Sequence, residues 1–366
     1  MIMKLNKKTL LFFFFSLIVF IGYSQNIYTY KKPVTLKDGW QTGSILNQNI
    51  DTTLIHKAFT QLLNIENEIH SILLIKNNEL VLEEYYKGYT IDKPHDLRSV
   101  TKSIVAILLG IALDKNIIED INDPISKYLK SPVPAKNIDK RKNEITIKNL
   151  ITMSSGLDCD DWNKKSKGQE DKVYKRKDWL QYTLNLPIIN EPGSTSTYCT
   201  MGVVLTAEII SQTSGLSIDE FAKTYLFDPL RIDNFYWSHT SKKKVIPSAK
   251  RVYMTPRDLA KIGQLVLNNG TWKGEQIVSK KWIEEATSPK TKITNIDYGY
   301  LWWNIPFNHK NTIIQSKIAT GNGGQYIMIL PSLNLVAIFT GGAYNSPKDK
   351  LPFAFLNDIF IPTFKE

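Results

Sequence analysis

The sequence predicts an α+β fold, in which an antiparallel β-sheet formed by the N- and C-terminal segments is flanked by helices and receives an inserted, mainly helical subdomain. β-rich runs separated by turn residues lie near the two ends of the chain, at 71–86 and 300–339. Helical patterns fill the region between them. The length of 366 residues suffices for one large domain or two ordinary ones, and 42% hydrophobic residues indicate a globular protein.

Residues 1–24 have the pattern of a secretory signal peptide. Three lysines precede the apolar run 10–21, and Gly22 and Ser24 follow it. The run is short for a membrane span, so an uncleaved anchor is the alternative interpretation. No cysteine follows the run, which argues against a lipoprotein. We therefore expect an exported bacterial protein, periplasmic or secreted, with no stable membrane span after cleavage near Ser24.

The chain is basic. Its formal charge of +11 falls to +8 when the three lysines of the leader are removed. The lysines are scattered, with small clusters at 164–167 and 242–244 that are not interleaved with stacking aromatic residues. We therefore expect no nucleic-acid partner. A lysine-rich surface, or attraction to an anionic envelope or substrate, accounts for the charge.

The first elements are predicted from their periodicity. Residues 25–50 form a polar arm, and the main domain is expected at 51–362, with the helical subdomain inserted at about 116–295. The pattern predicts a helix at 51–68 and two strands, 71–75 and 80–86, joined by a hairpin.

Further elements follow in order. Helices are predicted at 104–113, 120–129, 146–153, 179–186, 203–213, 217–227, 255–268 and 282–286. The strongest helix start is Thr255, which precedes a proline. Gly215 is expected to end the helix predicted at 203–213. Strands are predicted at 300–303, 312–318, 325–330 and 335–339, and a last helix at 347–359.

The tetrapeptide Ser-Val-Thr-Lys at 99–102 is the main candidate for chemistry. It opens an apolar helix, in which residues three positions apart lie on one face, so the amine of Lys102 can reach the hydroxyl of Ser99. Burial favours the neutral amine, which makes a proton acceptor for a serine nucleophile. The alternative interpretation is an ordinary N-cap serine and a solvated lysine.

Two later segments could complete such a site. Tyr198 stands at a loop-to-helix junction, where it could act as general base toward Ser99 and then as acid toward the leaving group. The segment 320–325 is rich in glycine and leads into a strand, so a backbone N–H there could join that of Ser99 in an oxyanion hole. A core tyrosine and a plain glycine turn are the alternatives.

The order and spacing of these three segments resemble the serine β-lactamase and penicillin-binding-protein superfamily. The resemblance is to the class C-like branch, with its esterases and 6-aminohexanoate-dimer hydrolases. Ser-x-x-Lys, Tyr-x-Asn and Lys/His-Thr-Gly are the three family motifs, and they match 99–102, 198–200 and 322–324. The segments 151–157 and 225–230 resemble further family segments, and the resemblance covers about 55–345.

The resemblance implies a β-lactamase/transpeptidase-like fold and an acyl-Ser99 intermediate, without metal or cofactor. Lys102 and Tyr198 would move the protons, and the N–H groups of Ser99 and Gln325 would bind the oxyanion. The residues expected to contact substrate are Thr200, Asn322, Gly323, Gly324 and Trp302. Trp162, Tyr300 and Trp303 could join Trp302 in an apolar pocket or could be core residues.

Two departures from the family motifs bear on the substrate. Thr200 replaces the family's asparagine, and Asn322 replaces a lysine that helps to hold the substrate's carboxylate. A neutral side chain cannot replace that charge. We therefore expect a small ester, amide or peptide substrate, with an ester, or an amide that does not use this contact, preferred over penicillin-like compounds.

Cys159 and Cys199 are the only two cysteines, and in an exported chain they are expected to form a disulfide. Two unrelated buried thiols are the alternative. Asp158, Asp160 and Asp161 could bind calcium, although a solvated loop is the simpler interpretation.

Three rival functions remain to be weighed. The chain has no Gly-x-Ser-x-Gly elbow, which argues against a Ser-His-Asp hydrolase. A true β-lactamase or D-Ala-type peptidase would use the same machinery. A non-catalytic binding protein of the cell envelope could use the same fold.

Overall fold

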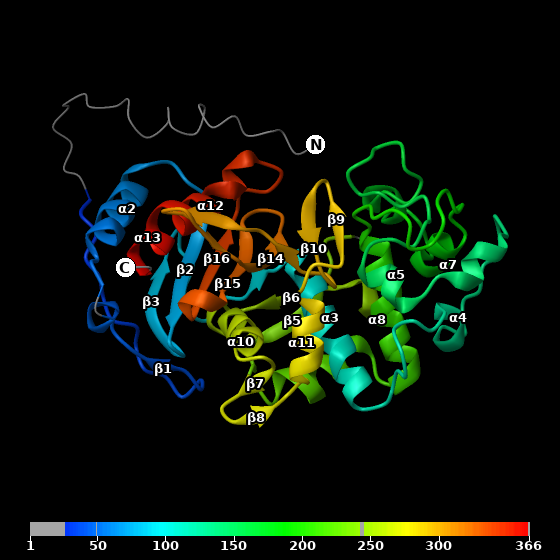
Figure 1. The fold of residues 1–366 in the computed structure, drawn as a ribbon, viewed down its shortest axis with the longest axis horizontal. Helices are drawn as coiled ribbons and strands as arrows, with labels where there is room; N and C mark the ends of the chain where they lie inside the picture. Colours follow the sequence, from blue (N-terminus) through cyan, green and yellow to red (C-terminus); the bar gives the residue numbers. More distant parts are fainter. Residues whose placement is uncertain (1–25, 49, 242–244, 365–366) are drawn as a thin grey trace.

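The computed structural model describes residues 26–48, 50–241 and 245–364. The predicted leader and the lysine cluster at 242–244 lie outside these ranges. A nine-stranded sheet organises the molecule, and its strands come from the two ends of the chain (Figure 1). In spatial order they are β1 (Gln41–Thr42), β3 (Glu79–Tyr85), β2 (Ile69–Lys76), β16 (Leu335–Gly341), β15 (Gln325–Leu330), β14 (Lys317–Gly321), β11 (Trp303–Asn304), β10 (Ile296–Tyr298) and β9 (Thr291–Ile293).

All neighbouring strands of this sheet pair antiparallel except β1 and β3, which are parallel. The central strands β15 and β16 are buried along their whole length because helices cover both faces. Side chains alternate across β16: Ile338 packs toward α10 (Pro256–Leu267), and Phe339 contacts Phe355 and Phe360 of the C-terminal segment. This arrangement confirms the predicted α+β fold class.

Helices form the other half of the molecule, seen at the right of Figure 1. Its centre is α8 (Thr200–Ser214), which contacts α3 (Val100–Asp114) and α5 (Ile147–Ile151). The remaining α-helices of this region are α4 (Ile125–Tyr128), α6 (Glu170–Val173), α7 (Trp179–Leu184) and α9 (Ile218–Ala222), and α11 (Lys280–Ala286) packs on α3. Because α3 also contacts β14 and β15, it joins the helical half to the sheet.

Several helix boundaries follow from local chemistry. Thr146 and Asn149 form a reciprocal capping box at the start of α5, and Thr255 caps α10 ahead of a proline at its first turn. Gly215 adopts the left-handed conformation at the end of α8, as the sequence predicts. The helix predicted at 51–68 is the shorter α2 (Thr53–Asn64).

The C-terminal part of the chain differs from the prediction in three places. Residues 300–303 are not one strand, because Leu301 has a left-handed φ of 63° and turns the chain before β11. The run 312–318 divides into β13 (Thr312–Ile314) and β14, which belong to different sheets. The last helix is broken into short segments between Pro347 and Phe364, including α12 (Leu351–Ala354) and α13 (Ile361–Phe364).

Three small sheets were not predicted, because each is built from short strands without clear alternation. β4 (His95–Asp96), β6 (Arg251–Met254) and β5 (Phe235–Ser238) form the largest of them, next to the first turn of α3. The other two are the hairpins β12 (Phe307–His309) with β13 and β7 (Thr271–Trp272) with β8 (Glu275–Gln276).

The N-terminal arm is attached to the domain by a buried ion-pair network. Arg257 of α10 pairs with Asp38 at 2.8 Å and with Glu83 of β3, and its side chain is only 3% exposed. Its carbonyl accepts a hydrogen bond from the indole N–H of Trp40 at 3.0 Å. Removing one partner of such a buried pair leaves an uncompensated charge, so the arm is held firmly.

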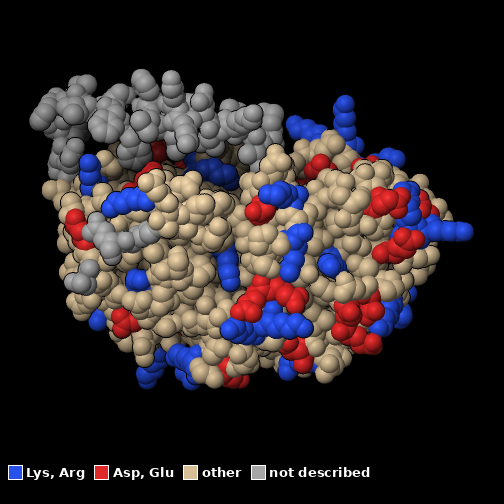
Figure 2. Space-filling model, viewed as in Figure 1, with Lys and Arg blue, Asp and Glu red and all other residues tan. Residues whose placement is uncertain are grey.

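On the face drawn in Figure 2, basic and acidic side chains are interspersed, and neither kind forms a continuous field. Among the described residues, no single helix has both the length and the apolar character needed to cross a membrane. Within the described ranges, the bent pair Thr200–Ser214 and Ile218–Phe227 alone reaches the required length and composition.

Candidate active site

Ser99 and Lys102 meet at the start of α3. Nζ of Lys102 lies 2.9 Å from Oγ of Ser99 and donates a hydrogen bond to it. Ser99 is the N-cap of this helix, yet its hydroxyl makes no capping hydrogen bond. Lys102 is 6% exposed, so it is not a solvated lysine. The side chains therefore form a pair, as the helical spacing predicts, and the simple N-cap interpretation does not describe them.

The residue before the serine has a strained backbone. Arg98 adopts a left-handed φ of 50°, which is uncommon for a residue with a side chain. Asp96 holds this conformation, because one of its carboxylate oxygens accepts from the Arg98 N–H at 3.0 Å and the other lies 3.1 Å from its Nε. The N–H of Ser99 forms no hydrogen bond with any described residue, so it remains available for an incoming oxygen.

Tyr198 lies beside the lysine. Nζ of Lys102 is 5.1 Å from the centre of the Tyr198 ring. Trp162 stacks on Tyr198, with the two ring centroids 4.9 Å apart and the ring planes almost parallel, and the ring of Trp303 lies 6.0 Å from that of Tyr198. Tyr198 is only 8% exposed, whereas Trp162 is 42% exposed. The aromatic neighbours therefore fix the orientation of a ring that is nearly buried.

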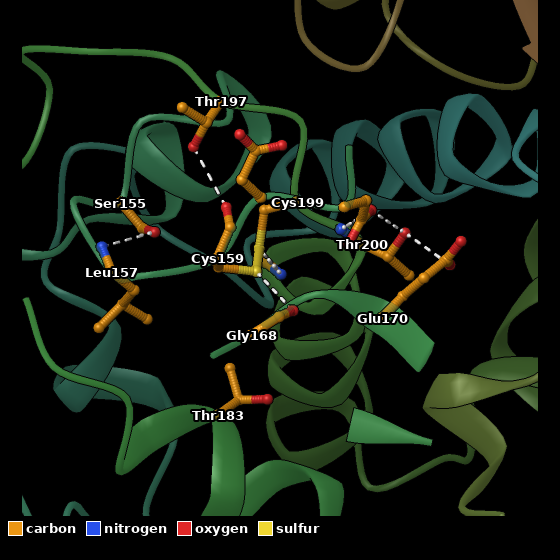
Figure 3. Close-up of a disulfide and its surroundings, with 12 residues drawn as sticks. Ser155, Leu157, Cys159, Gly168, Glu170, Thr183, Thr197, Cys199 and Thr200 are labelled. Carbon is orange, nitrogen blue, oxygen red and sulfur yellow. Dashed lines mark hydrogen bonds between the residues drawn. A yellow bond between two sulfur atoms is a disulfide. The ribbon is translucent and has the colours of Figure 1, made fainter. Parts of the chain in front are cut away.

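The segment 159–162, which we call the clamp segment, runs beside residues 197–199, which we call the tyrosine loop. Several bonds join the two (Figure 3). Cys159 and Cys199 form the disulfide that the sequence predicts. The Thr197 hydroxyl donates to the Cys159 carbonyl at 3.1 Å, and the Asp161 N–H donates to the Tyr198 carbonyl at 2.8 Å. Together with the stacking of Trp162, these bonds tie every residue from 197 to 199 to the clamp segment.

Asp161 lies in the site, although the sequence suggested for it only calcium binding or a solvated loop. One oxygen of its carboxylate accepts from both the backbone N–H and the hydroxyl of Thr200, at 2.8 and 2.6 Å. Its other oxygen is buried and has no hydrogen-bond partner among the described residues. Burial and the nearby Glu170 carboxylate raise the pKa of Asp161 to about 7, while the Lys102 ammonium and the bonds from Thr200 act in the opposite direction.

The three aspartates of this loop do not converge on one point. Asp158 accepts from the Lys167 N–H and Asp160 from the Trp162 N–H, whereas Asp161 turns toward Thr200. Among the residues that the structure describes, no three His, Cys, Asp or Glu side chains are placed to share a metal ion.

The glycine-rich segment forms the turn between β14 and β15. Gly323 and Gly324 both have φ of 95°, which a residue with a side chain rarely adopts. The Gln325 side chain is fully buried and bonds to both the N–H and the carbonyl of Gly341. Asn322 exchanges two hydrogen bonds with Asn345. Gln325 is thus held at the end of its strand by its own side chain.

A cleft opens over Ser99 and Lys102. Thr200 and Asn322, two of the residues expected to contact substrate, line it. Charged residues also line it, namely Arg98, Glu170, Lys250 and Arg251.

The aromatic residues divide between the core and the surface. Trp302, which the sequence suggested for the substrate pocket, is 1% exposed and belongs to the hydrophobic core. Tyr300 and Trp303 are buried as well, so the core alternative applies to all three. Trp162 differs from them because its ring is exposed beside Tyr198. The chain turns at Leu301, directly before Trp302, and the periodicity of the sequence did not reveal this turn.

Comparisons with known proteins find relatives of this chain. A family model described as Beta-lactamase matches residues 69–352. An uncharacterised protein of Alkalihalophilus pseudofirmus is 24% identical over 79% of this chain and 87% of its own length. A 6-aminohexanoate-dimer hydrolase of Paenarthrobacter ureafaciens is 23% identical over 63% of this chain and 60% of its own length.

Solved structures have the same fold. A structure described as a putative 6-aminohexanoate-dimer hydrolase from Bacillus anthracis has a TM-score of 0.67 and 20% identity, and covers 92% of this chain and 87% of that one. A class C β-lactamase has a TM-score of 0.61 and 16% identity, and covers 83% of this chain and 93% of that one.

Proposed function

Because the chain belongs to the Beta-lactamase family of serine hydrolases, we propose that it cleaves a carboxylic ester or amide through an acyl-Ser99 intermediate. The contact of 2.9 Å between Lys102 Nζ and Ser99 Oγ carries this proposal. A serine activated by a neighbouring amine needs no histidine. The absence of a capping bond on Ser99 supports the proposal, because the hydroxyl is not committed to the helix.

The proposed reaction has two steps. Tyr198, assisted by Lys102, accepts the proton of Ser99 as Oγ attacks the carbonyl carbon. The N–H groups of Ser99 and Gln325 bind the oxyanion, the bond to the leaving group breaks, and the leaving group takes the proton. Water then attacks the carbonyl carbon of acyl-Ser99, and the same base accepts its proton. The bond between that carbon and Oγ breaks, Oγ takes the proton back, and the carboxylic acid leaves.

The substrate preference is proposed from the contacts around Thr200 and Asn322. The hydroxyl of Thr200 is bonded to Asp161, and the amide of Asn322 to Asn345, so neither residue stands free as the family's asparagine or lysine would. Esters and linear amides are therefore proposed as substrates ahead of β-lactams. The relatives' names include a 6-aminohexanoate-dimer hydrolase, which is consistent with an amide.

Steady-state hydrolysis tests the proposed activity. The protein is expected to hydrolyse p-nitrophenyl acetate or butyrate, and Ser99→Ala is expected to lower kcat by at least about 1,000-fold. Nitrocefin serves as the β-lactam arm. Rapid nitrocefin turnover with poor ester turnover would overturn the preference for esters, and ester turnover retained in Ser99→Ala would overturn the role of the serine.

We also propose that the protein is exported. The leader-like pattern of residues 1–24 supports export. The disulfide between Cys159 and Cys199 supports it as well, because such bonds persist in oxidising compartments. Fractionation of the native host, with immunodetection in each fraction, tests this; retention of the protein in the cytoplasm with its leader uncleaved would contradict it.

A further inference from the structure

Three cations share the cleft with the proposed nucleophile. Arg98 directly precedes Ser99, and Lys250 and Arg251 come from the chain that enters β6. Two separate segments therefore bring positive charge to the same cleft. The proposed acyl-transfer steps use none of these three side chains.

The charge of these cations is only partly balanced. Asp96 is the one carboxylate within ion-pair distance of either arginine among the described residues, at 3.1 Å from Arg98 and 3.3 Å from Arg251. It also accepts from the Tyr253 hydroxyl at 3.0 Å. Lys250 has no carboxylate within this distance in the described part of the chain. One carboxylate thus faces two guanidinium groups, and the lysine adds a third positive charge.

The two arginines also keep hydrogen-bonding capacity. The side chains of Arg98 and Arg251 remain 26% and 14% exposed, and besides Asp96 the Arg251 guanidinium donates to the Thr240 hydroxyl at 3.2 Å. A guanidinium group carries five N–H donors, and its fork matches the two oxygens of a carboxylate.

Glu170, the acidic residue that lines the cleft, forms no ion pair with the three cations among the described residues. Oε2 of Glu170 accepts from the Tyr174 hydroxyl at 2.7 Å and lies 3.4 Å from the hydroxyl of Thr200. The positive charge of the cleft therefore stays available to a bound molecule.

We propose that Arg98, Lys250 and Arg251 bind a carboxylate of the substrate, so that the substrates are esters or amides that carry an anionic group near the scissile bond. This inference rests on the proposed function. It assigns to these cations the charge that Asn322 lacks, from positions outside the three motifs. The low dielectric of a partly buried site strengthens such pairing.

Matched ester pairs test the proposal on either side of the scissile bond. Mono-p-nitrophenyl glutarate and p-nitrophenyl valerate differ by a carboxylate on the acyl side. 4-Acetoxybenzoate and its methyl ester differ by a carboxylate on the leaving group. After subtraction of spontaneous hydrolysis, kcat/KM is expected to favour the anionic member of at least one pair by about ten-fold or more, the size of one retained charge-assisted hydrogen bond.

Variants assign the preference to the cations. Lys250→Gln, Arg251→Gln and Arg98→Gln are each expected to lower the ratio of anionic to neutral kcat/KM by at least about three-fold, and 0.5 M NaCl should lower the wild-type ratio through screening. Lys57→Gln, on the exposed surface of α2, removes the same charge outside the cleft and should leave the ratio unchanged. Thermal unfolding of each variant checks that it folds. Lys250→Gln, which breaks no ion pair with any described residue, is the variant least expected to disturb the fold.

The outcomes separate this inference from the proposed function. Hydrolysis of both members of each pair at equal kcat/KM, or an anionic preference that survives in all three variants, would overturn the inference while leaving the hydrolase intact. Failure to hydrolyse any ester, with no covalent labelling of Ser99, would overturn the proposed function and this inference with it.

Discussion

At the scale of single residues, Ser99 and Lys102 form a hydrogen-bonded pair at the first turn of α3. The hydroxyl is free of capping, and the amine that contacts it is 6% exposed. Arg98 supplies a left-handed turn immediately before them. Strained residues of this kind concentrate at functional sites, where the surrounding structure compensates for their cost of about 1–3 kcal/mol.

Removal of either proton carrier is expected to slow the chemical step. Lys102→Ala and Tyr198→Phe should each lower kcat for an ester by about 100-fold or more, since each deletes a group proposed to move the Ser99 proton. Steady-state kinetics with circular dichroism as a folding check measures this. Rates near those of the wild type in either variant would refute the role of that residue.

Asp161 should make stability depend on pH. Its pKa is raised to about 7 in the folded protein, above the ordinary value near 3.8, because of burial and Glu170. The folded state therefore binds more protons than the unfolded state between about pH 4 and 7, so this group's contribution to stability decreases as pH rises through that window. Asp161→Asn, which keeps an oxygen to accept from Thr200, should show a smaller loss of Tm between pH 5 and 8 than the wild type.

The groups that face Asp161 define the control for this measurement. They are Lys102 on α3, Glu170 and Tyr174 at α6, and the hydroxyl of Thr200. Glu170→Gln keeps Asp161 but removes the nearby carboxylate. It should therefore lower the pKa of Asp161 and narrow the pH range over which this group changes the stability. An Asp161→Asn protein whose Tm changes with pH as the wild type does would contradict the assignment.

At the scale of elements, the clamp segment and the tyrosine loop behave as one unit. The disulfide closes a loop of 40 residues. Replacing both cysteines, as Cys159→Ser with Cys199→Ser, is expected to lower the free energy of unfolding by about 3–4 kcal/mol on the chain-entropy model. Urea unfolding of the double variant against the wild type measures it. A loss of less than about 1 kcal/mol would show that the other bonds of the clamp segment suffice.

A second element-level contact fixes α3 itself. A Cβ added at Gly110 would lie about 2.0 Å from Trp282 Cδ1, and the Trp282 indole N–H donates to the Ala106 carbonyl at 2.8 Å. Gly110→Ala should therefore force α11 away and destabilise the protein by about 1–3 kcal/mol, despite alanine's higher helix propensity. Val105→Ala, on the same helix but at the cleft, is the variant whose thermal stability is compared with that of Gly110→Ala. Unchanged thermal stability in Gly110→Ala would mean that α11 can move freely.

At the scale of the whole molecule, the sequence predicted the architecture where patterns are long and regular. The strand at 325–330, the hairpin at Asn77-Asn78 and the start of α10 have strong local signals, and the structure contains all three. The broken C-terminal helix and the division of the run 312–318 had no such signal, because tertiary packing decides both.

The residues of the site also fall into those that the local sequence predicted and those that it did not. Helical spacing was enough to place Lys102 against Ser99, and motif order was enough to single out Tyr198. The contact of Asp161 with Thr200 and the gathering of the three cations were not predicted, because these residues come from loops and short strands that meet only in the folded chain. The burial of Trp302 depends on the turn at Leu301, which left no trace in the pattern.

The central claim is that Ser99 is the residue acylated in the reaction. Incubation with a fluorophosphonate probe, followed by intact mass measurement and peptide mapping, tests it most directly. We expect one adduct per chain, located on Ser99, absent in Ser99→Ala and formed far more slowly in Lys102→Ala. An unmodified wild-type protein, or an adduct that persists in Ser99→Ala, would contradict the claim.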